Sequence, residues 1–282
     1  MLTDNTITLH AERPRWRPAP AIIFSLLLHA AGVIALLLHP GLWPWIFGVL
    51  AGNHLALSGA ALMPRGRLLG PNLTRLPEAA AQRGEVAFTF DDGPDPNITP
   101  QVLDLLDRYH AKASFFCIGE RAAAYPDLVK EITRRGHSVE NHSYHHPHAF
   151  ALYGVARLRR EIAAAQKTIT SITGSAPQFF RAPVGFRSPM LDFVLAQSGL
   201  RYVSWTRRGL DGVHNAPAAV LRRLTNGLAA GDILLLHDGV CLGDNEPAVL
   251  SVLPILLEQL ASHGLRSTSL AVAFAAGTEP PL

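Results

Sequence analysis

The chain has 282 residues, of which 48% are hydrophobic and 17% charged, and its formal net charge is +3. This length accommodates one large α/β domain or two smaller domains. The basic residues are scattered along the chain, so the composition excludes the clustered basic surface of a nucleic-acid-binding protein. The high apolar content indicates a membrane-embedded segment. Cys117 and Cys241 are far apart and predict buried free thiols.

Two uncharged apolar stretches lie near the N-terminus, at residues 21–38 and 42–63, on either side of Pro40-Gly41. Each stretch is close to the roughly 20 residues that a helix needs to cross a bilayer. Trp43 and Trp45 occupy the place of an interfacial aromatic belt. The sequence therefore predicts a hairpin of two transmembrane helices. A cleavable signal peptide or a pair of buried core helices is the alternative interpretation.

Positive charges flank this pair of stretches on both outer sides and are absent from the turn between them. The flanking residues are Arg13, Arg15 and Arg17 before the first stretch, and Arg65, Arg67 and Arg75 after the second. Because positively charged flanks stay inside, both ends are expected in the cytoplasm. We therefore expect a protein of a bacterial-type inner membrane, with its main domain on the cytoplasmic side.

From Glu85 onward, short apolar runs alternate with helical patterns. In chain order, the strands are expected at residues 86–90, 114–118, 137–140, 178–182, 202–205, 232–237 and 265–270. The helices between them are expected at residues 99–109, 126–135, 155–172, 188–198, 217–229 and 247–262. Seven strands alternating with helices favour parallel βα units closed into a barrel, and an open doubly wound sheet is the alternative.

The domain organisation follows from these patterns. Residues 1–20 form an N-terminal tail, residues 21–64 the two transmembrane helices, residues 65–84 a linker, and residues 85–275 the α/β domain. Within that domain, the polar residues suited to catalysis follow the predicted strands at their C-terminal ends. In a parallel barrel, this edge is where active sites assemble. The pattern predicts an enzyme, and its residues are Asp91, Asp92, His142, Arg181, Asp211 and His237.

Four histidines lie within residues 142–148. His142 and His146 are four residues apart, and a helical turn would put both on one face, as two ligands of one metal ion require. Asp91 or Asp92 can supply a third, anionic ligand. The other aspartate can then act as general base toward a metal-bound water. A simple turn is the alternative interpretation of the Asp-Asp-Gly sequence.

A general acid is needed to protonate the leaving group, and His237 ends an apolar strand in a suitable place. Asp211 can hold the imidazole of His237 in its charged form and raise its pKa. Arg181 can orient the free carboxylate of the aspartate pair through a bidentate contact. The alternative roles are a surface salt bridge for Arg181 and a loop carboxylate for Asp211.

These motifs closely resemble those of the polysaccharide deacetylases, carbohydrate esterase family four, which share the NodB-homology fold. The resemblance spans about two thirds of the chain and implies a distorted seven-stranded (β/α) barrel with a divalent metal ion, usually zinc. The matching segments are Thr89-Phe90-Asp91-Asp92-Gly93-Pro94, His142-Ser143-Tyr144-His145-His146, Arg181-Ala182-Pro183-Val184-Gly185 and Leu235-Leu236-His237.

The resemblance also implies a role for each matching residue. Asp91 would be the base, Arg181 would orient it, and His237 would be the acid. The metal ligands would be Asp92, His142 and His146.

The fourth motif departs from the family pattern. Trp205 and Asp211 are kept, but Arg208 and Gly212 stand where the family usually has an aspartate and a tryptophan. The wall of the substrate groove is therefore expected to differ from that of relatives that act on chitin or peptidoglycan. The residues expected to contact the substrate are Pro183, Gly185, Trp205 and Arg208.

The sequence thus predicts a membrane-anchored, metal-dependent amidohydrolase that removes an N-acyl group, first of all N-acetyl, from a glycan or a lipid-linked sugar. A cytoplasmic domain favours the lipid-linked sugar, with Arg208 meeting a phosphate. A non-haem iron oxygenase is one alternative, because two histidines and one carboxylate also form its facial triad. An inactive glycan-binding domain is another, because the fourth motif is altered.

Overall fold

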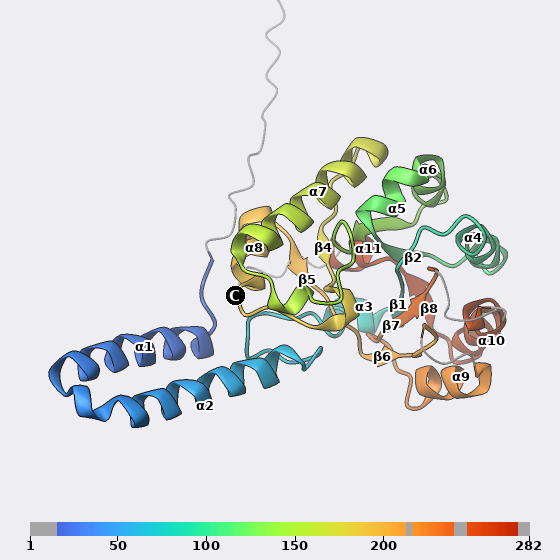
Figure 1. The fold of residues 1–282 in the computed structure, drawn as a ribbon. Coiled ribbons are helices and arrows are strands. Elements are labelled where there is room, and N and C mark those ends of the chain that lie inside the picture. Colours follow the sequence, from blue (N-terminus) through green and yellow to red (C-terminus); the bar gives the residue numbers. More distant parts are fainter. Residues whose placement is uncertain (1–15, 213–215, 240–246, 276–282) are drawn as a thin grey trace, which may run out of the picture.

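The structure, a computed structural model, describes residues 16–212, 216–239 and 247–275 (Figure 1). Arg13, Arg15 and Cys241 lie outside these residues. The N-terminal part is a helical hairpin that projects from an α/β barrel. Its helices are α1 (Pro20–Leu38) and α2 (Trp43–Ala61), joined by a 3-10 turn (Pro40–Leu42).

The barrel has short parallel strands at its centre and helices around them (Figure 1). The strands are β1 (Glu85–Asp91), β2 (Ala113–Cys117), β3 (Ser138–Asn141), β4 (Phe179–Phe180), β5 (Arg201–Tyr202), β6 (Arg207–Arg208), β7 (Ile233–His237) and β8 (Arg266–Thr268). The helices are α3 (Glu78–Gln82), α4 (Thr99–Arg108), α5 (Gly119–Ala124), α6 (Pro126–Arg134), α7 (Val155–Thr173), α8 (Leu191–Ser198), α9 (Pro217–Thr225), α10 (Ala248–Ser262) and α11 (Leu270–Ala275). Two further 3-10 turns are Phe150–Leu152 and Pro183–Gly185.

The strand order explains how the sheet closes. Along the sheet the order is β5-β4-β3-β2-β1-β7-β6, and β8 pairs with the start of β1. β5 and β6 stand at opposite ends of this order, yet only residues 203–206 separate them in the chain. One continuous stretch therefore pairs with β4 at its start and with β7 at its end, and this curls the sheet into a distorted barrel. The predicted barrel is confirmed, although the strand expected at residues 202–205 is replaced by the two short strands on either side of it.

The central strand β1 is buried along its whole length. Its apolar residues pack with those of α4, α9 and α10, whose helical patterns present one apolar side to the sheet. The strand register brings Asp91 and His237 to the same edge of the sheet, because Asp91 at the end of β1 is paired with Phe116 of β2 and with His237 of β7.

The helical hairpin is held together by polar contacts between its two helices. Asn53 Nδ2 donates to Ser25 Oγ at 2.8 Å, and the Nε2 atoms of His29 and His54 are 3.2 Å apart. Within the described chain, α1 alone is long and apolar enough to cross a membrane by length and composition. The second helix of the predicted membrane pair, α2, is equally long. It carries more polar residues, so its mean hydropathy is too low for it to qualify as a membrane span.

The segment at residues 65–84, which the sequence suggests is a linker, packs against the barrel. Leu76 is buried in an apolar cluster of the barrel, whereas Leu69 packs with Ile22 and Ala61 of the helical hairpin. Leu73 forms a parallel bridge with Val203, and Arg75 forms an antiparallel bridge with Asp232. Because β5 and β6 do not continue through residues 203–206, this segment covers the irregular part of the barrel wall.

Candidate active site

A cavity of about 330 Å³ opens at the C-terminal ends of the strands. It collects side chains from distant parts of the chain, as expected for a parallel barrel. The cavity is lined by Asp91, Asp92, Ile118, Arg121, His142, His146, His148, Val184, Gly185, Trp205, Arg208, Gly212, Leu235 and His237.

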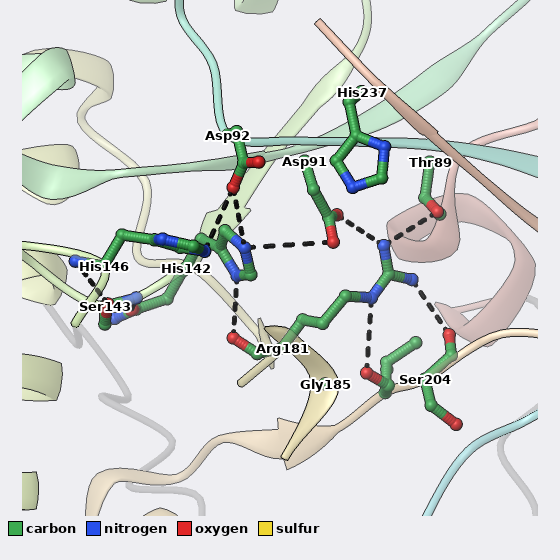
Figure 2. Close-up of polar contacts among 12 residues, drawn as sticks. Thr89, Asp91, Asp92, His142, Ser143, His146, Arg181, Gly185, Ser204 and His237 are labelled. Carbon is green, nitrogen blue, oxygen red and sulfur yellow. Dashed lines mark hydrogen bonds and ion pairs between the residues drawn. The ribbon is translucent and has the colours of Figure 1, made fainter. Parts of the chain in front are cut away.

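Asp91, which lines the cavity, forms a buried ion pair with Arg181 (Figure 2). Arg181 Nη1 donates to Asp91 Oδ1 at 2.6 Å and to Thr89 Oγ1 at 2.9 Å, while Nη2 donates to the Ser204 carbonyl at 2.9 Å. The contact with Asp91 therefore involves one nitrogen, so the predicted bidentate geometry is wrong: the other donors of Arg181 are used by its surroundings. Arg181 is fully buried, which excludes a surface salt bridge.

Asp92, His142 and His146 come together on one side of the cavity (Figure 2). Asp92 Oδ1 lies 3.3 Å from His142 Nε2 and 3.1 Å from His146 Nε2. One ligand atom from each of these residues lies within 4.8 Å of the others. The predicted helical turn between the histidines does not form: Ser143 and His146 have left-handed φ values of 64° and 52° instead, and this bend brings the rings together.

The hydrogen bonds of these side chains fit a cation. His142 Nδ1 lies 2.9 Å from the Arg181 carbonyl, so a neutral ring carries its proton there and keeps a lone pair on Nε2. Asp92 Oδ1 is buried, and no described residue donates a hydrogen bond to it. Lone pairs of a carboxylate oxygen and an imidazole nitrogen thus face one another, an arrangement that is unfavourable unless a proton or a metal ion lies between them.

The pKa values of these groups reflect the same crowding. Burial raises the pKa of Asp92, but the adjacent His142 outweighs it and holds the pKa below its usual range. Burial lowers the pKa of His142, and Asp91 and Asp92 more than compensate, so it is raised. For His146, burial and the neighbouring His142 lower the pKa to about 4.

His237 and Asp211 form the other side of the site. His237 Nδ1 lies 2.9 Å from Asp211 Oδ1, and the backbone N–H of His237 donates to Asp211 Oδ2 at 2.8 Å. Burial lowers the pKa of His237, but the charge of Asp211 and this hydrogen bond raise it to about 9. Asp211 is itself buried and holds both the ring and the backbone of His237.

The residues predicted to contact substrate divide into two groups. Gly185, Trp205 and Arg208 line the cavity, whereas Pro183 is buried and is not among the lining residues. A Cβ atom on Gly185 would lie 2.6 Å from the Trp205 ring, and Gly185 has a φ of 86°, so no other residue fits there.

Comparison with known proteins places these motifs in a family. The polysaccharide deacetylase family model matches residues 78–203. A peptidoglycan-N-acetylglucosamine deacetylase of Bacillus cereus is 34% identical over 183 residues, which cover 64% of this chain and 84% of that protein. The chain belongs to the polysaccharide deacetylase family.

Two further members of the family are similar to this chain. A chitooligosaccharide deacetylase of Azorhizobium caulinodans is 34% identical, over 56% of this chain and 75% of that protein. A solved structure of a peptidoglycan N-acetylglucosamine deacetylase superposes with a TM-score of 0.66 and 28% identity, covering 74% of this chain and 95% of that chain. As a polysaccharide deacetylase, the protein is a hydrolase of carbon–nitrogen bonds other than peptide bonds, which confirms the predicted enzyme class.

Two further residues of this polysaccharide deacetylase lie at the site without having been assigned a role from the sequence. Arg121 lines the cavity, and its Nη1 donates to the Asp92 carbonyl at 2.8 Å. His148 also lines the cavity, 6.0 Å from His146 between ring centroids. Arg121 lies on α5, a short helix without a strong apolar pattern, so no sequence signal connects it to Asp92.

Proposed function

We propose that this protein is a metal-dependent N-deacetylase acting on N-acetylated amino sugars of a glycan or a lipid-linked sugar. The observation that carries the proposal is the convergence of one oxygen and two nitrogens from Asp92, His142 and His146. These three residues would hold the metal ion, and zinc suits this set of ligands. The similarity to a peptidoglycan-N-acetylglucosamine deacetylase and to a chitooligosaccharide deacetylase supports an amino-sugar substrate.

A divalent cation in this position supplies a Lewis acid for the amide carbonyl and lowers the pKa of the attacking water. Asp91, beside the cation ligands, accepts the proton from that water as general base. Arg181 holds Asp91 through the 2.6 Å contact, so one carboxylate oxygen is fixed and the other remains available. Asp91 Oδ2 lies 3.8 Å from His142 Nε2, on the side of the cation ligands.

His237 protonates the departing amine as general acid. The ordinary pKa of histidine leaves the ring mainly neutral at pH 7, and a neutral ring has no proton to give from Nε2 while Nδ1–H bonds Asp211. With its pKa raised to about 9, His237 is protonated at neutral pH. Two oxygens of Asp211 fix the direction in which the ring delivers its proton.

We also propose that α1 and α2 anchor the enzyme to a membrane, with the barrel on the cytoplasmic side. Large apolar side chains of both helices face outward, among them Leu37 and Trp45, each 77% exposed. Such an apolar surface is unfavourable in water and suits a bilayer. The arginines on both outer sides of the hairpin, among them Arg17 and Arg65, support the cytoplasmic orientation.

The mechanism is tested by measuring acetate release from N-acetylglucosamine oligomers by the purified chain. Asp91→Asn is expected to reduce kcat about 10²- to 10⁴-fold, as for loss of a general base, while the metal content is retained. A chelator should abolish activity, and added Zn²⁺ should restore it. Asp127→Asn is the matched control, because Asp127 is an exposed carboxylate with its side chain 93% accessible. Full activity in Asp91→Asn would exclude the proposed base.

A further inference from the structure

Arg208 is a partly buried cation whose side chain forms no hydrogen bond or ion pair with the described part of the chain. It alternates with Arg207 on β6, so the two side chains point to opposite faces of the strand. Arg207 Nε bonds Asp232 at 2.6 Å, away from the cavity, whereas Arg208 lines the cavity. Arg208 Nε is buried and has no hydrogen-bond acceptor among the residues that the structure describes. Its guanidinium carbon lies 5.1 Å from the centre of the Trp205 ring, whose face holds it in place.

The carboxylates of the cavity are already engaged by other groups. Asp91 is bonded to Arg181 at 2.6 Å, and Asp92 faces His142 and His146. Among the described residues Arg208 therefore has no carboxylate partner, and a negatively charged group of the ligand would compensate its charge. A guanidinium with free donors recognises a phosphate group through paired hydrogen bonds. A neutral glycan does not require such a cation.

The wall that carries Arg208 is attached directly to the end of the helical hairpin. The Arg187 N–H donates to the Ala61 carbonyl at 3.0 Å, and Arg65 Nη1 donates to the Thr206 carbonyl at 3.1 Å. A Cβ atom on Gly185 would lie 3.3 Å from Pro64. Arg208 follows Thr206 by two residues, about 7 Å along an extended strand. With the hairpin in a bilayer, this wall lies beside the membrane surface, where lipid phosphates are found.

We propose that the substrate is an N-acetylated amino sugar joined through a phosphate to a membrane lipid, and that Arg208 binds this phosphate. The inference rests on the proposed deacetylase function and specifies its substrate class. The phosphate would pair with Arg208, which has no ion-pair partner among the described residues. The lipid would lie beside the cavity wall, which is hydrogen-bonded to the end of the hairpin.

The test compares three substrates that carry the same N-acetylglucosamine: a neutral oligomer, the soluble 1-phosphate, and the farnesyl phosphodiester in nanodiscs. Full-length wild type, Arg208→Gln, Arg208→Lys and Arg222→Ala are assayed for kcat and KM in nanodiscs. Arg208→Gln should raise KM for both phosphates and lower their kcat/KM relative to the oligomer about 10- to 100-fold, the range for a hydrogen bond to a charged group. Arg208→Lys should recover part of this loss. Arg222 is an exposed arginine on α9, so Arg222→Ala controls for net charge.

The outcomes separate the parts of the inference. If Arg208→Gln and Arg208→Lys weaken all three substrates equally, the phosphate contact is excluded. If the wild type prefers the farnesyl diester over the soluble phosphate by about tenfold or more, as anchoring in one membrane predicts, the lipid is supported; equal efficiency excludes it. Activity on the oligomer alone overturns this inference and leaves the deacetylase function intact. No acetate from any of the three contradicts the proposed function itself.

Discussion

The helical hairpin and the barrel use similar apolar residues in opposite ways. Every residue of β1 is buried, whereas only 11% of the apolar stretch in α1 is buried. Apolar composition therefore does not distinguish the two regions; the distinction lies in what surrounds them. The barrel supplies its own apolar environment, and we propose that a bilayer supplies one for the hairpin. Both regions pair their polar groups, Asn53 with Ser25 in the hairpin and Arg181 with Asp91 in the barrel.

Removing the segment between these regions is expected to have the largest effect, because it tests where the barrel begins. A chain that starts at residue 77 loses Leu76, which belongs to the same apolar cluster as Val203 and Ile233 of the barrel and contributes about 2–3 kcal/mol of burial. It also loses Asn72, which accepts a hydrogen bond from the buried Ser204. Arg187 loses its carbonyl acceptors at Gly66, Leu69 and Gly70. These losses approach the whole stability of a domain, roughly 5–15 kcal/mol.

Thermal unfolding followed by circular dichroism checks this expectation, with a chain that starts at residue 64 as the control. The longer chain should unfold cooperatively, and the shorter one should lack a cooperative transition. Equal midpoints for the two chains would show that the barrel begins after residue 77, as a true linker would require.

Replacement of a metal ligand ranks next and sharpens the comparison, since it should affect the barrel alone. His142→Ala is expected to lower kcat/KM by about 10³-fold or more, the several kcal/mol that a metal Lewis acid contributes. Metal analysis should find the ion lost, while membrane fractionation stays unchanged. His145→Ala is the matched control, because the exposed His145 ring bonds Glu161 at 2.9 Å instead. Retention of metal and activity in His142→Ala would remove His142 from the site.

The smallest expected effect is a shift in pH dependence. The proposed general acid His237 would act in its protonated form, so activity should be present below its pKa of about 9 and fall as the pH rises through that value. In Asp211→Asn the raising effect of the carboxylate is gone while burial still lowers the pKa. The alkaline limb of kcat should therefore move toward or below the ordinary value of 6.5. A pH–rate profile measures this shift, and an unmoved limb would assign it to another group.

The parts of the fold that sequence could predict are those with strong local patterns. β1 and β7 are mainly apolar runs, and α7 is followed by Gly174 as its C-cap, in a left-handed conformation. β6 consists only of Arg207 and Arg208, so it has no apolar signal, and its pairing with β7 arises from closure of the sheet. The packing of residues 65–84 likewise depends on partners far along the chain.

The candidate site divides in the same way. Asp91, His142 and His237 stand at strand ends, and strand ends in a parallel barrel meet, so their proximity was predictable. The bend between His142 and His146 was not, because Ser143 and His146 adopt left-handed φ values, which are uncommon for residues other than glycine. The single-nitrogen contact of Arg181 also depends on Thr89 and the Ser204 carbonyl, which compete for its other donors.

Arg181 joins two functions through different parts of one residue. Its side chain holds Asp91, and its backbone carbonyl accepts the hydrogen bond of His142 Nδ1. A displacement of this residue would consequently move the proposed base and a proposed metal ligand together. We therefore expect proton transfer and cation binding to be coupled, so that the free-energy costs of substitutions at Asp91 and His142 are not additive.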